Sequence, residues 1–237
     1  DGLYAGSTPD VSALVLSHAH LDHHGLAHYV HPDIPVYGSR GTIKMLRASK
    51  LFVPDAAVPA KLRELPNPGT VSIGSFYVRG IPVDHAAPDS RALLVEADGQ
   101  RLLYSGDLRA HGRQRHLFEE LPEAVGPIDV LVLEGTTVGQ PQGSHGFADE
   151  ADVEIRLTEL LRHDGGMVIV IASGQNIDRA VSVYSAALAT GRELVIDPYQ
   201  AYILMALKDV CPEAPQFDSP SVRVKFIQYH VAKLKDA

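Results

Sequence analysis

The sequence predicts an α/β protein made of two parts that differ in how their strands and helices follow one another. In the first part, short apolar runs suited to strands alternate with loops, short helices and a hairpin. In the second part, apolar runs and longer helical segments alternate one by one, which is typical of a parallel sheet. A stretch rich in Gly, Pro and Gln at 136–146 separates them. We therefore place the boundary so that residues 1–140 and 141–237 form the two parts.

The first part opens with two strand–helix pairs. An apolar run over residues 12–17 is suited to a buried strand, and the following segment 22–30 is suited to a helix. A second short strand is expected at 35–38, followed by a helix over 40–48. Both pairs place polar residues directly after an apolar run.

Extended segments make up the rest of the first part. Residues 69–90 and 91–107 are predicted to form consecutive strands. Within the second segment, Asp98-Gly99 lies between two alternating apolar stretches, which is the usual signal for a tight hairpin. A further buried strand is expected at 130–134, ending in a polar loop.

The second part alternates regularly. A strong helix is expected over 148–163, followed by a buried strand at 167–173, "MVIVIAS". A helix over 176–189, a strand at 193–197 and a helix over 199–210 complete the pattern. This order predicts parallel strands joined by helical crossovers.

Composition restricts the class of protein. The 237-residue chain is 45% hydrophobic and 21% charged, as in ordinary globular proteins. Its formal net charge of -8 provides no overall basic field for nucleic acid, although a local basic groove is compatible with it. A single cysteine, Cys211, excludes an intramolecular disulfide framework and a Cys-rich zinc site. No apolar run approaches the roughly 18–20 residues of a membrane span, so a reducing cytoplasm is the expected compartment and no membrane partner is predicted.

Histidines gather directly after the first predicted strand, in "LVLSHAHLDHH". Residues two apart in an extended strand end point the same way, so His18 and His20 would present their imidazoles on one face. Asp22 and His23, at the start of the next helix, can face a second position nearby. Imidazole and carboxylate together suit zinc, with manganese or iron as alternatives. The competing interpretation is a set of surface histidines with Asp22 capping a helix.

Two further candidates end later strands. His85 follows "FYVRGIPVD", and Asp107 follows "RLLYSG". A carboxylate can bridge two cations, which makes Asp107 the natural shared ligand. Cations about 3.5–4 Å apart could hold a hydroxide between them as the nucleophile. The neighbouring Asp84 is expected to orient a ligand.

These motifs resemble the metallo-β-lactamase fold superfamily. "HAHLDH" at 18–23 is similar to its signature, and His85 and Asp107 fall where its third and fourth motifs belong. The resemblance implies an αββα sandwich and two divalent metal ions, most simply zinc. It places one ion on His18, His20 and His85, and the other on Asp22, His23 and the bridging Asp107. His20 occupies the position that separates the hydrolases from the di-iron redox branch, which usually carries Glu there.

Later segments resemble one branch of that superfamily, the ribonuclease J-like β-CASP nucleases. The similar segments are 85–112, 129–137 and the opening of an inserted parallel α/β domain at 165–204. The resemblance implies that Glu134 closes a strand as an active-site acid. Strands that normally precede the first motif and later histidine motifs have no equivalents here. We therefore expect an N-terminally incomplete sandwich, part of the inserted domain, and a sequence taken from a longer protein.

The leading hypothesis is a metal-dependent phosphodiesterase that cleaves RNA, less readily DNA, with a metal-held hydroxide as nucleophile and with Asp22 and Glu134 as catalytic candidates. RNA or single-stranded nucleic acid would be the partner, and Arg109, Arg113 and Arg115 could approach its phosphates. One alternative is a hydrolase of thioesters, lactones or other small esters. Another is a non-catalytic subunit that keeps the fold. The sequence leaves the oligomeric state open, with a homo-oligomer as one option.

Overall fold

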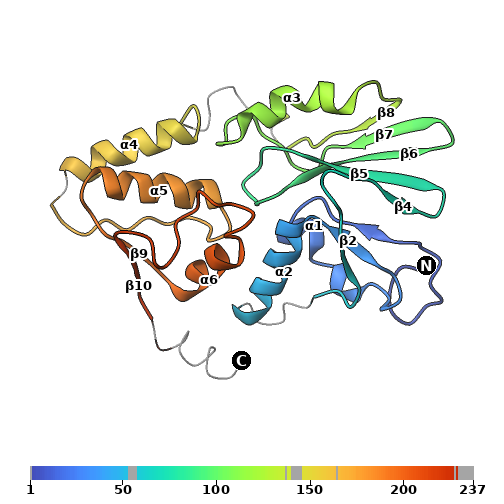
Figure 1. Ribbon diagram of the computed structural model, residues 1–237, viewed down its shortest axis with the longest axis horizontal. Coiled ribbons are helices and arrows are strands. Elements are labelled where there is room, and N and C mark those ends of the chain that lie inside the picture. Colours follow the sequence, from blue (N-terminus) through green and yellow to red (C-terminus); the bar gives the residue numbers. More distant parts are fainter. Residues whose placement is uncertain are drawn as a thin grey trace.

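The first part of the chain is a layered sandwich in which helix α2, a smaller sheet, a larger sheet and helix α3 follow one another (Figure 1). The computed structural model describes residues 2–52, 58–136, 138–139, 146–163, 165–226 and 228. The expected boundary between residues 140 and 141 lies outside the described residues. The order of layers confirms the α/β class predicted from the sequence.

The smaller sheet carries the first histidine motif. Its strands, all parallel and in spatial order, are β1 (Leu14–Val15), β2 (Val36–Gly38) and β3 (Leu62–Glu64). Helix α2 (Arg40–Phe52) covers one face and begins where the Ser39 hydroxyl accepts the amide hydrogen of Thr42 at 3.1 Å, an N-cap contact. Leu46 of this helix packs with Leu16, which directly follows β1, and with Val36 of β2.

The larger sheet supplies the other site segments. Its strands, in spatial order, are β4 (Val71–Ile73), β5 (Phe76–Pro82), β6 (Arg91–Ala97), β7 (Gln100–Tyr104) and β8 (Val130–Val132). Neighbours are antiparallel except β7 and β8, which run parallel. Asp98 and Gly99 join β6 to β7 with φ values of 51° and 75°. Two positive φ values in a two-residue loop define the hairpin turn that the sequence predicted.

Alternation along β6 divides the core into two layers. Leu93 packs with Leu65 and Val78 between the two sheets, whereas its neighbour Leu94 packs with Val125 on the opposite face. Val125 belongs to helix α3 (Arg115–Val125), which covers that outer face. Alternate side chains of β6 therefore pack against the smaller sheet on one face and against α3 on the other.

The second part contains helices and a small parallel sheet (Figure 1). Its elements are α4 (Glu150–His163), α5 (Ile177–Ala189), β9 (Leu194–Ile196), α6 (Pro198–Ala206) and β10 (Val222–Val224). Asn176 caps α5 by accepting the Arg179 amide hydrogen at 3.1 Å, and Asp197 caps α6 through Gln200 at 2.7 Å. None of the described helices combines the length and apolar character needed to cross a bilayer.

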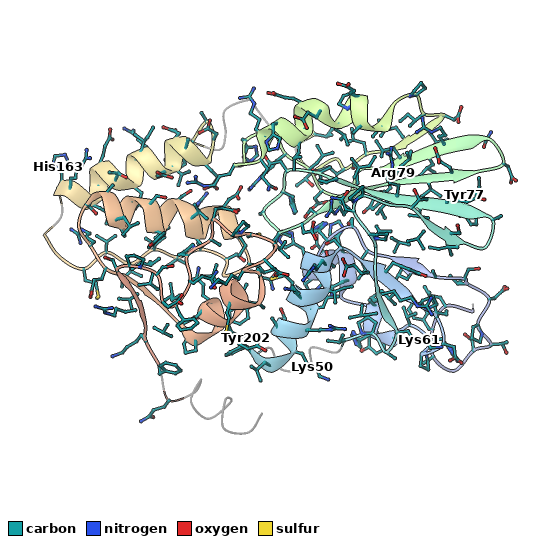
Figure 2. The ribbon with its side chains drawn as sticks, in the orientation of Figure 1. Lys50, Lys61, Tyr77, Arg79, His163 and Tyr202 are labelled. Atoms are coloured by element: carbon teal, nitrogen blue, oxygen red, sulfur yellow. The ribbon has the colours of Figure 1, made fainter. Side chains whose placement is uncertain are left out.

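The two parts share a hydrophobic core. Ala19, Met45 and Ala48 from the first part form one cluster with residues of α5 and α6, including Ile203 and Leu204. Tyr202 of α6 lies beside the end of α2 (Figure 2), where its ring centroid is 5.6 Å from that of Phe52. This packing places α5 and α6 next to the segment that carries the first histidines.

Several elements differ from the sequence prediction. The helix expected over 22–30 is a single turn, α1 (Leu21–His24), followed by a 3₁₀ turn, η1 (Ala27–Tyr29). The chain bends here because Val30 pairs with Tyr4 in an isolated bridge, and the amide of His31 donates to the Leu3 carbonyl at 2.8 Å. Elements that the sequence analysis did not predict are β3, α3 and β10. Pairing with a neighbouring strand defines β3 and β10, and packing against the larger sheet supports α3.

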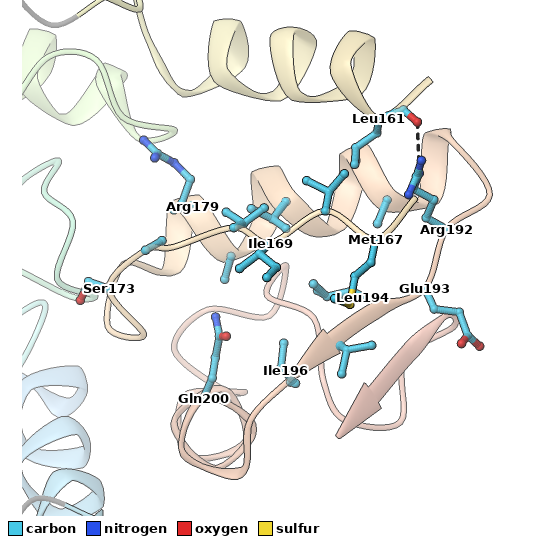
Figure 3. A pocket seen from close by; sticks show the side chains of 17 residues that line it. Leu161, Met167, Ile169, Ser173, Arg179, Arg192, Glu193, Leu194, Ile196 and Gln200 are labelled. Carbon is cyan, nitrogen blue, oxygen red and sulfur yellow. Dashed lines mark hydrogen bonds between the residues drawn. The ribbon is translucent and has the colours of Figure 1, made fainter. Parts of the chain in front are cut away.

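The strand expected at 167–173 is absent from the described structure. The segment is extended but unpaired, and Ile171 is 94% exposed. A cavity of about 530 Å³ separates it from β9 (Figure 3), so the ladder hydrogen bonds that would define a strand do not form. The strand expected at 130–134 does form, but it lies at the edge of the described sheet and Leu131 is exposed, contrary to the expected burial.

Candidate metal centre

The predicted ligands come from four segments that meet where strands end. His18 and His20 follow β1, and Asp22 and His23 lie on α1. His85 follows β5 and Asp107 follows β7. The amide of Arg91 donates to the Ser17 carbonyl at 2.9 Å, which joins the end of the smaller sheet to the start of β6 in the larger one. This main-chain bond brings the ligand-bearing ends of both sheets together.

Gly106 allows the Asp107 loop to approach the first histidine motif. Its φ of 57° lies in the left-handed region, which disfavours side chains with a Cβ. A Cβ at this position would lie 2.8 Å from Cβ of Ser17 and 3.1 Å from the Arg91 carbonyl oxygen. Glycine is therefore required both by backbone conformation and by the close approach of the two loops.

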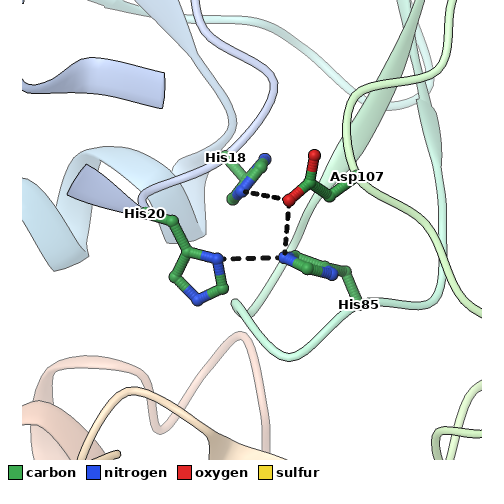
Figure 4. Close-up of side chains that lie close together, drawn as sticks. All are labelled: His18, His20, His85 and Asp107. Carbon is green, nitrogen blue, oxygen red and sulfur yellow. Dashed lines mark hydrogen bonds and ion pairs between the residues drawn. The ribbon is translucent and has the colours of Figure 1, made fainter. Parts of the chain in front are cut away.

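The first group of side chains consists of His18, His20, His85 and Asp107, whose candidate ligand atoms lie within 4.8 Å of one another. Figure 4 shows their polar atoms facing a common point. Nε2 of His85 lies 3.0 Å from Nδ1 of His20. Oδ2 of Asp107 lies 3.8 Å from Nε2 of His18 and 3.8 Å from Nε2 of His85.

The second group consists of Asp22, His23 and the same Asp107. Nε2 of His23 lies 3.2 Å from Oδ1 of Asp107 and 3.5 Å from Oδ2 of Asp22. The two oxygens of Asp107 thus face different groups, Oδ2 the first and Oδ1 the second. This division is the arrangement expected of a bridging carboxylate.

Burial keeps the imidazoles of the first group neutral. Burial together with the neighbouring His85 and His23 lowers the pKa of His18 to about 2, and burial together with His20 lowers the pKa of His85 to about 4. Burial also lowers the pKa of His20. Burial raises the pKa of Asp107, an effect that His23 partly offsets. Neutral imidazoles are the form that binds a metal.

The donor set fits a divalent cation. His18 is completely buried, yet its Nε2 has no hydrogen-bond partner among the described residues. Its other ring nitrogen, Nδ1, lies 3.1 Å from the Ser17 hydroxyl, which can accept a hydrogen bond from Nδ1–H and so leave the Nε2 lone pair free. Tetrahedral zinc with bonds of about 2.0–2.1 Å needs ligand atoms about 3.3 Å apart. The contacts of 3.0–3.8 Å in this cluster bracket that separation.

Glu134 lies beside the centre and outside both ligand groups. Its Oε1 accepts the amide hydrogen of Leu108 at 2.9 Å, and its own amide donates to the Ser105 hydroxyl at 3.1 Å. Burial opposes its ionisation, but hydrogen bonds from Leu108 and Thr136 outweigh this and lower the pKa of Glu134. The carboxylate therefore holds the residue that directly follows Asp107.

The arginines considered as phosphate contacts are engaged by carboxylates of the protein. Arg109 pairs with Asp84 and Asp178, Arg113 with Glu154, and Arg115 with Glu119. Ser17, Gly106 and Asp178 are not among the site residues predicted from the sequence. Ser17 and Gly106 directly precede predicted ligands, a signal that could have found them, whereas Asp178 lies far away in the sequence.

Comparison with known proteins gives a family match and distant relatives. A family model described as a beta-lactamase superfamily domain matches residues 4–162. The ribonuclease J of Mycobacterium tuberculosis is 28% identical over 201 residues, which cover 78% of this chain and 34% of that protein. A ribonuclease of Thermus thermophilus is 23% identical over 236 residues, or 92% of this chain and 53% of the relative. The chain thus spans about a third of the length of the mycobacterial relative.

A solved structure has the same fold. A protein of unknown function from Enterococcus faecalis V583 superimposes with a TM-score of 0.75 at 21% identity, covering 94% of this chain and 60% of that one. At this identity the likeness concerns the fold alone. It extends beyond the sandwich, because it includes most of the second part.

Proposed function

Because the chain belongs to the metallo-β-lactamase superfamily, we propose that it is a metal-dependent hydrolase that cleaves phosphodiester bonds of RNA. The observation that carries the proposal is the shared position of Asp107 between two groups of histidine and carboxylate ligands. The names of the curated relatives, which are ribonucleases, support the choice of RNA.

In this proposal the two groups hold two divalent ions, most simply zinc. His18, His20 and His85 would bind the first ion, Asp22 and His23 the second, and Asp107 both. Ser17 would keep His18 in the tautomer that presents Nε2. Glu134 would act on the same loop by holding the Leu108 amide, and it remains our candidate for an active-site acid.

Bound cations would supply Lewis acidity, which generates a nucleophile at neutral pH and neutralises charge that develops on the phosphoryl oxygens. Asp22 is the exposed member of the six predicted ligands, with a side chain 77% accessible to solvent. In this proposal its solvent-accessible carboxylate would accept the proton of an attacking water, while the buried imidazoles remain neutral. His18 and His85 do not carry the second, imidazolium proton near neutral pH, so in this proposal they serve as ligands rather than as general acids.

The test compares substrates on one metal-loaded preparation. Purified protein, loaded with Zn²⁺ or Mn²⁺, is given 5′-monophosphorylated single-stranded RNA, DNA of the same sequence, and a panel of thioesters and lactones. Asp107→Asn serves as the matched inactive variant, because it removes the shared charge and keeps the size of the side chain. We expect cleavage of RNA that requires metal and is lost in this variant.

Other outcomes identify the alternatives. Faster turnover of a thioester or lactone than of RNA would assign the protein to small-molecule hydrolysis. A protein that binds neither Zn²⁺ nor Mn²⁺ and cleaves none of the substrates would instead be a non-catalytic subunit. Either result would refute the proposed nuclease activity.

A further inference from the structure

We propose that Arg109 and Asp178 are positioning residues of the metal centre, through which helix α5 of the second part holds the loop that carries Asp107. Together with Asp84 they form a charged chain from the edge of the site to α5, Asp84–Arg109–Asp178. The inference rests on the proposed metal centre and adds that the second part of the chain positions the Asp107 loop.

The inner end of the chain is Asp84, which directly precedes the predicted ligand His85. Asp84 is 1% exposed, so its carboxylate has to be paired within the protein. Its Oδ2 accepts the amide hydrogen of Gly112 at 2.7 Å and its Oδ1 accepts Nε–H of Arg109 at 3.3 Å. Its main-chain oxygen accepts the Arg109 amide hydrogen at 2.8 Å. The loop after Asp107 is thus wrapped around one buried carboxylate.

Gly112 shows how closely this wrapping is fitted. A Cβ at this position would overlap Oδ1 of Asp84 and the guanidinium of Arg109. The space is filled by the ion pair itself. The loop therefore has little freedom to move relative to His85 while Arg109 stays in place.

The outer end of the chain is Asp178, the second residue of α5. Nη2 of Arg109 donates to Oδ2 of Asp178, and the same oxygen accepts the Arg113 amide hydrogen at 2.9 Å. The side chains of Arg109 and Asp178 are 11% and 14% exposed. Removing one partner of a charged pair this far from water leaves an uncompensated buried charge on the other, which is costly.

Helix α5 is itself firmly supported. Glu150 of α4 accepts two hydrogen bonds from Arg179 of α5, at 3.1 and 2.8 Å, and one from Ser182 at 2.9 Å. The Glu150 amide also donates to the His111 carbonyl at 3.1 Å. Asp178 is therefore held in place by the packing of α4 against α5, and its carboxylate in turn fixes the position of the Arg109 guanidinium.

The position of Arg109 explains why the Asp84–Arg109–Asp178 ion pairs affect the metal centre as well as stability. Arg109 lies two residues after Asp107 on the same loop. Without the charge of Asp178, its guanidinium keeps Asp84 as its one carboxylate partner among the described residues and gains free donors. Those donors can turn towards Asp107, where a cationic group would compete with a metal ion for the bridging carboxylate.

Co²⁺ binding to the metal-free protein tests the proposal, because Co²⁺ absorption in the visible range reports both affinity and ligand geometry. The test variant is Asp178→Asn. The matched control is Glu154→Gln, which removes the ion pair of Arg113 with α4 and leaves Arg109 untouched. We expect Asp178→Asn to weaken Co²⁺ binding roughly 10- to 100-fold, as loss of a ligand-orienting partner does, and to change the absorption spectrum. Glu154→Gln should change neither.

Each other outcome has a definite meaning. If Asp178→Asn bound Co²⁺ with wild-type affinity and spectrum, even with a lower melting temperature, the ion pairs would serve stability alone and the proposal would be overturned. Equal weakening in the Glu154→Gln control would do the same. Arg109→Lys, which keeps the charge and loses the planar fork, is measured alongside in case Asp178→Asn does not fold; unchanged Co²⁺ binding in folded Arg109→Lys would also overturn it. If the wild-type protein bound no Co²⁺, the proposed metal centre itself would be refuted.

Discussion

Nδ1 of His20 lies 3.0 Å from Nε2 of His85, although 65 positions separate the two residues along the chain. Both imidazoles have a lowered pKa because burial disfavours their charged forms. Two neutral rings at this separation can share one N–H···N hydrogen bond or direct both lone pairs at a common cation. The carboxylate of Asp107 beside them favours the cation.

This contact predicts the effect of removing His85. His85→Ala should weaken Zn²⁺ binding by more than the roughly 10- to 100-fold expected for loss of a mere orienting partner, because a direct ligand is lost. Competition with a chromogenic chelator measures the affinity. His28→Ala is the control, since the His28 ring contacts that of Tyr29 and belongs to neither ligand group. If the two variants bound Zn²⁺ equally well, His85 could not be a ligand.

Asp22 and Asp107 should differ in their effect on metal content. Asp107 belongs to both ligand groups and Asp22 to one. Asp107→Asn should therefore reduce occupancy of both positions, whereas Asp22→Ala should lower the metal-to-protein ratio by about one ion and abolish hydrolysis. Elemental analysis after gel filtration measures the ratio. Asp33→Ala is the control, because Asp33 is an exposed partner of Lys61. Full activity and unchanged metal content in Asp22→Ala would refute the assignment.

Buried neutral histidines predict how stability of the metal-free protein depends on pH. The pKa values of His18 and His85 are about 2 and about 4 in the folded chain, against 6.5 for an ordinary histidine. Below about pH 6.5 the unfolded chain binds protons that the folded chain does not, so the free energy of unfolding should fall as the pH falls. Above that pH these histidines should not make the free energy of unfolding depend on pH.

Urea denaturation of the metal-free protein at several pH values between about 7.5 and about 5 measures this dependence. A His18→Asn variant should lose stability less steeply over the same range, because it lacks one of the suppressed protonations. If the slopes of the variant and the wild type were identical, His18 would not be held neutral by burial.

Gly106 and Gly99 provide a matched pair for testing the close approach of two loops. Both have positive φ, but a Cβ at Gly99 would meet nothing within 4 Å, whereas one at Gly106 would lie 2.8 Å from Cβ of Ser17. Gly99→Ala should cost about 1–2 kcal/mol in unfolding free energy from backbone conformation alone. Gly106→Ala should cost about 1–3 kcal/mol more from overpacking. It should also weaken Zn²⁺ binding, because the Asp107 loop has to move; wild-type binding in a destabilised Gly106→Ala protein would contradict this.

Local sequence patterns predicted the parts of the fold that depend on neighbouring residues. The turn at Asp98-Gly99 and the helix expected over 176–189 both formed, because backbone conformation and side-chain hydrogen bonds such as the Asn176 cap act over a few residues. The segment 167–173 has an equally apolar pattern, yet it is unpaired and exposed in the structure. A strand exists only if another strand lies beside it, and no local pattern supplies that partner.

The sequence by itself determined which residues are candidate ligands, since His18, His20, Asp22 and His23 follow one strand and His85 and Asp107 each end another. Tertiary structure alone decided which oxygen of Asp107 faces which group, that Ser17 contacts the buried ring of His18, and that Asp178 reaches Arg109. The physical reason is that ligand type is a property of single residues. Ligand spacing, burial and charge pairing depend instead on how segments distant in the chain pack against one another.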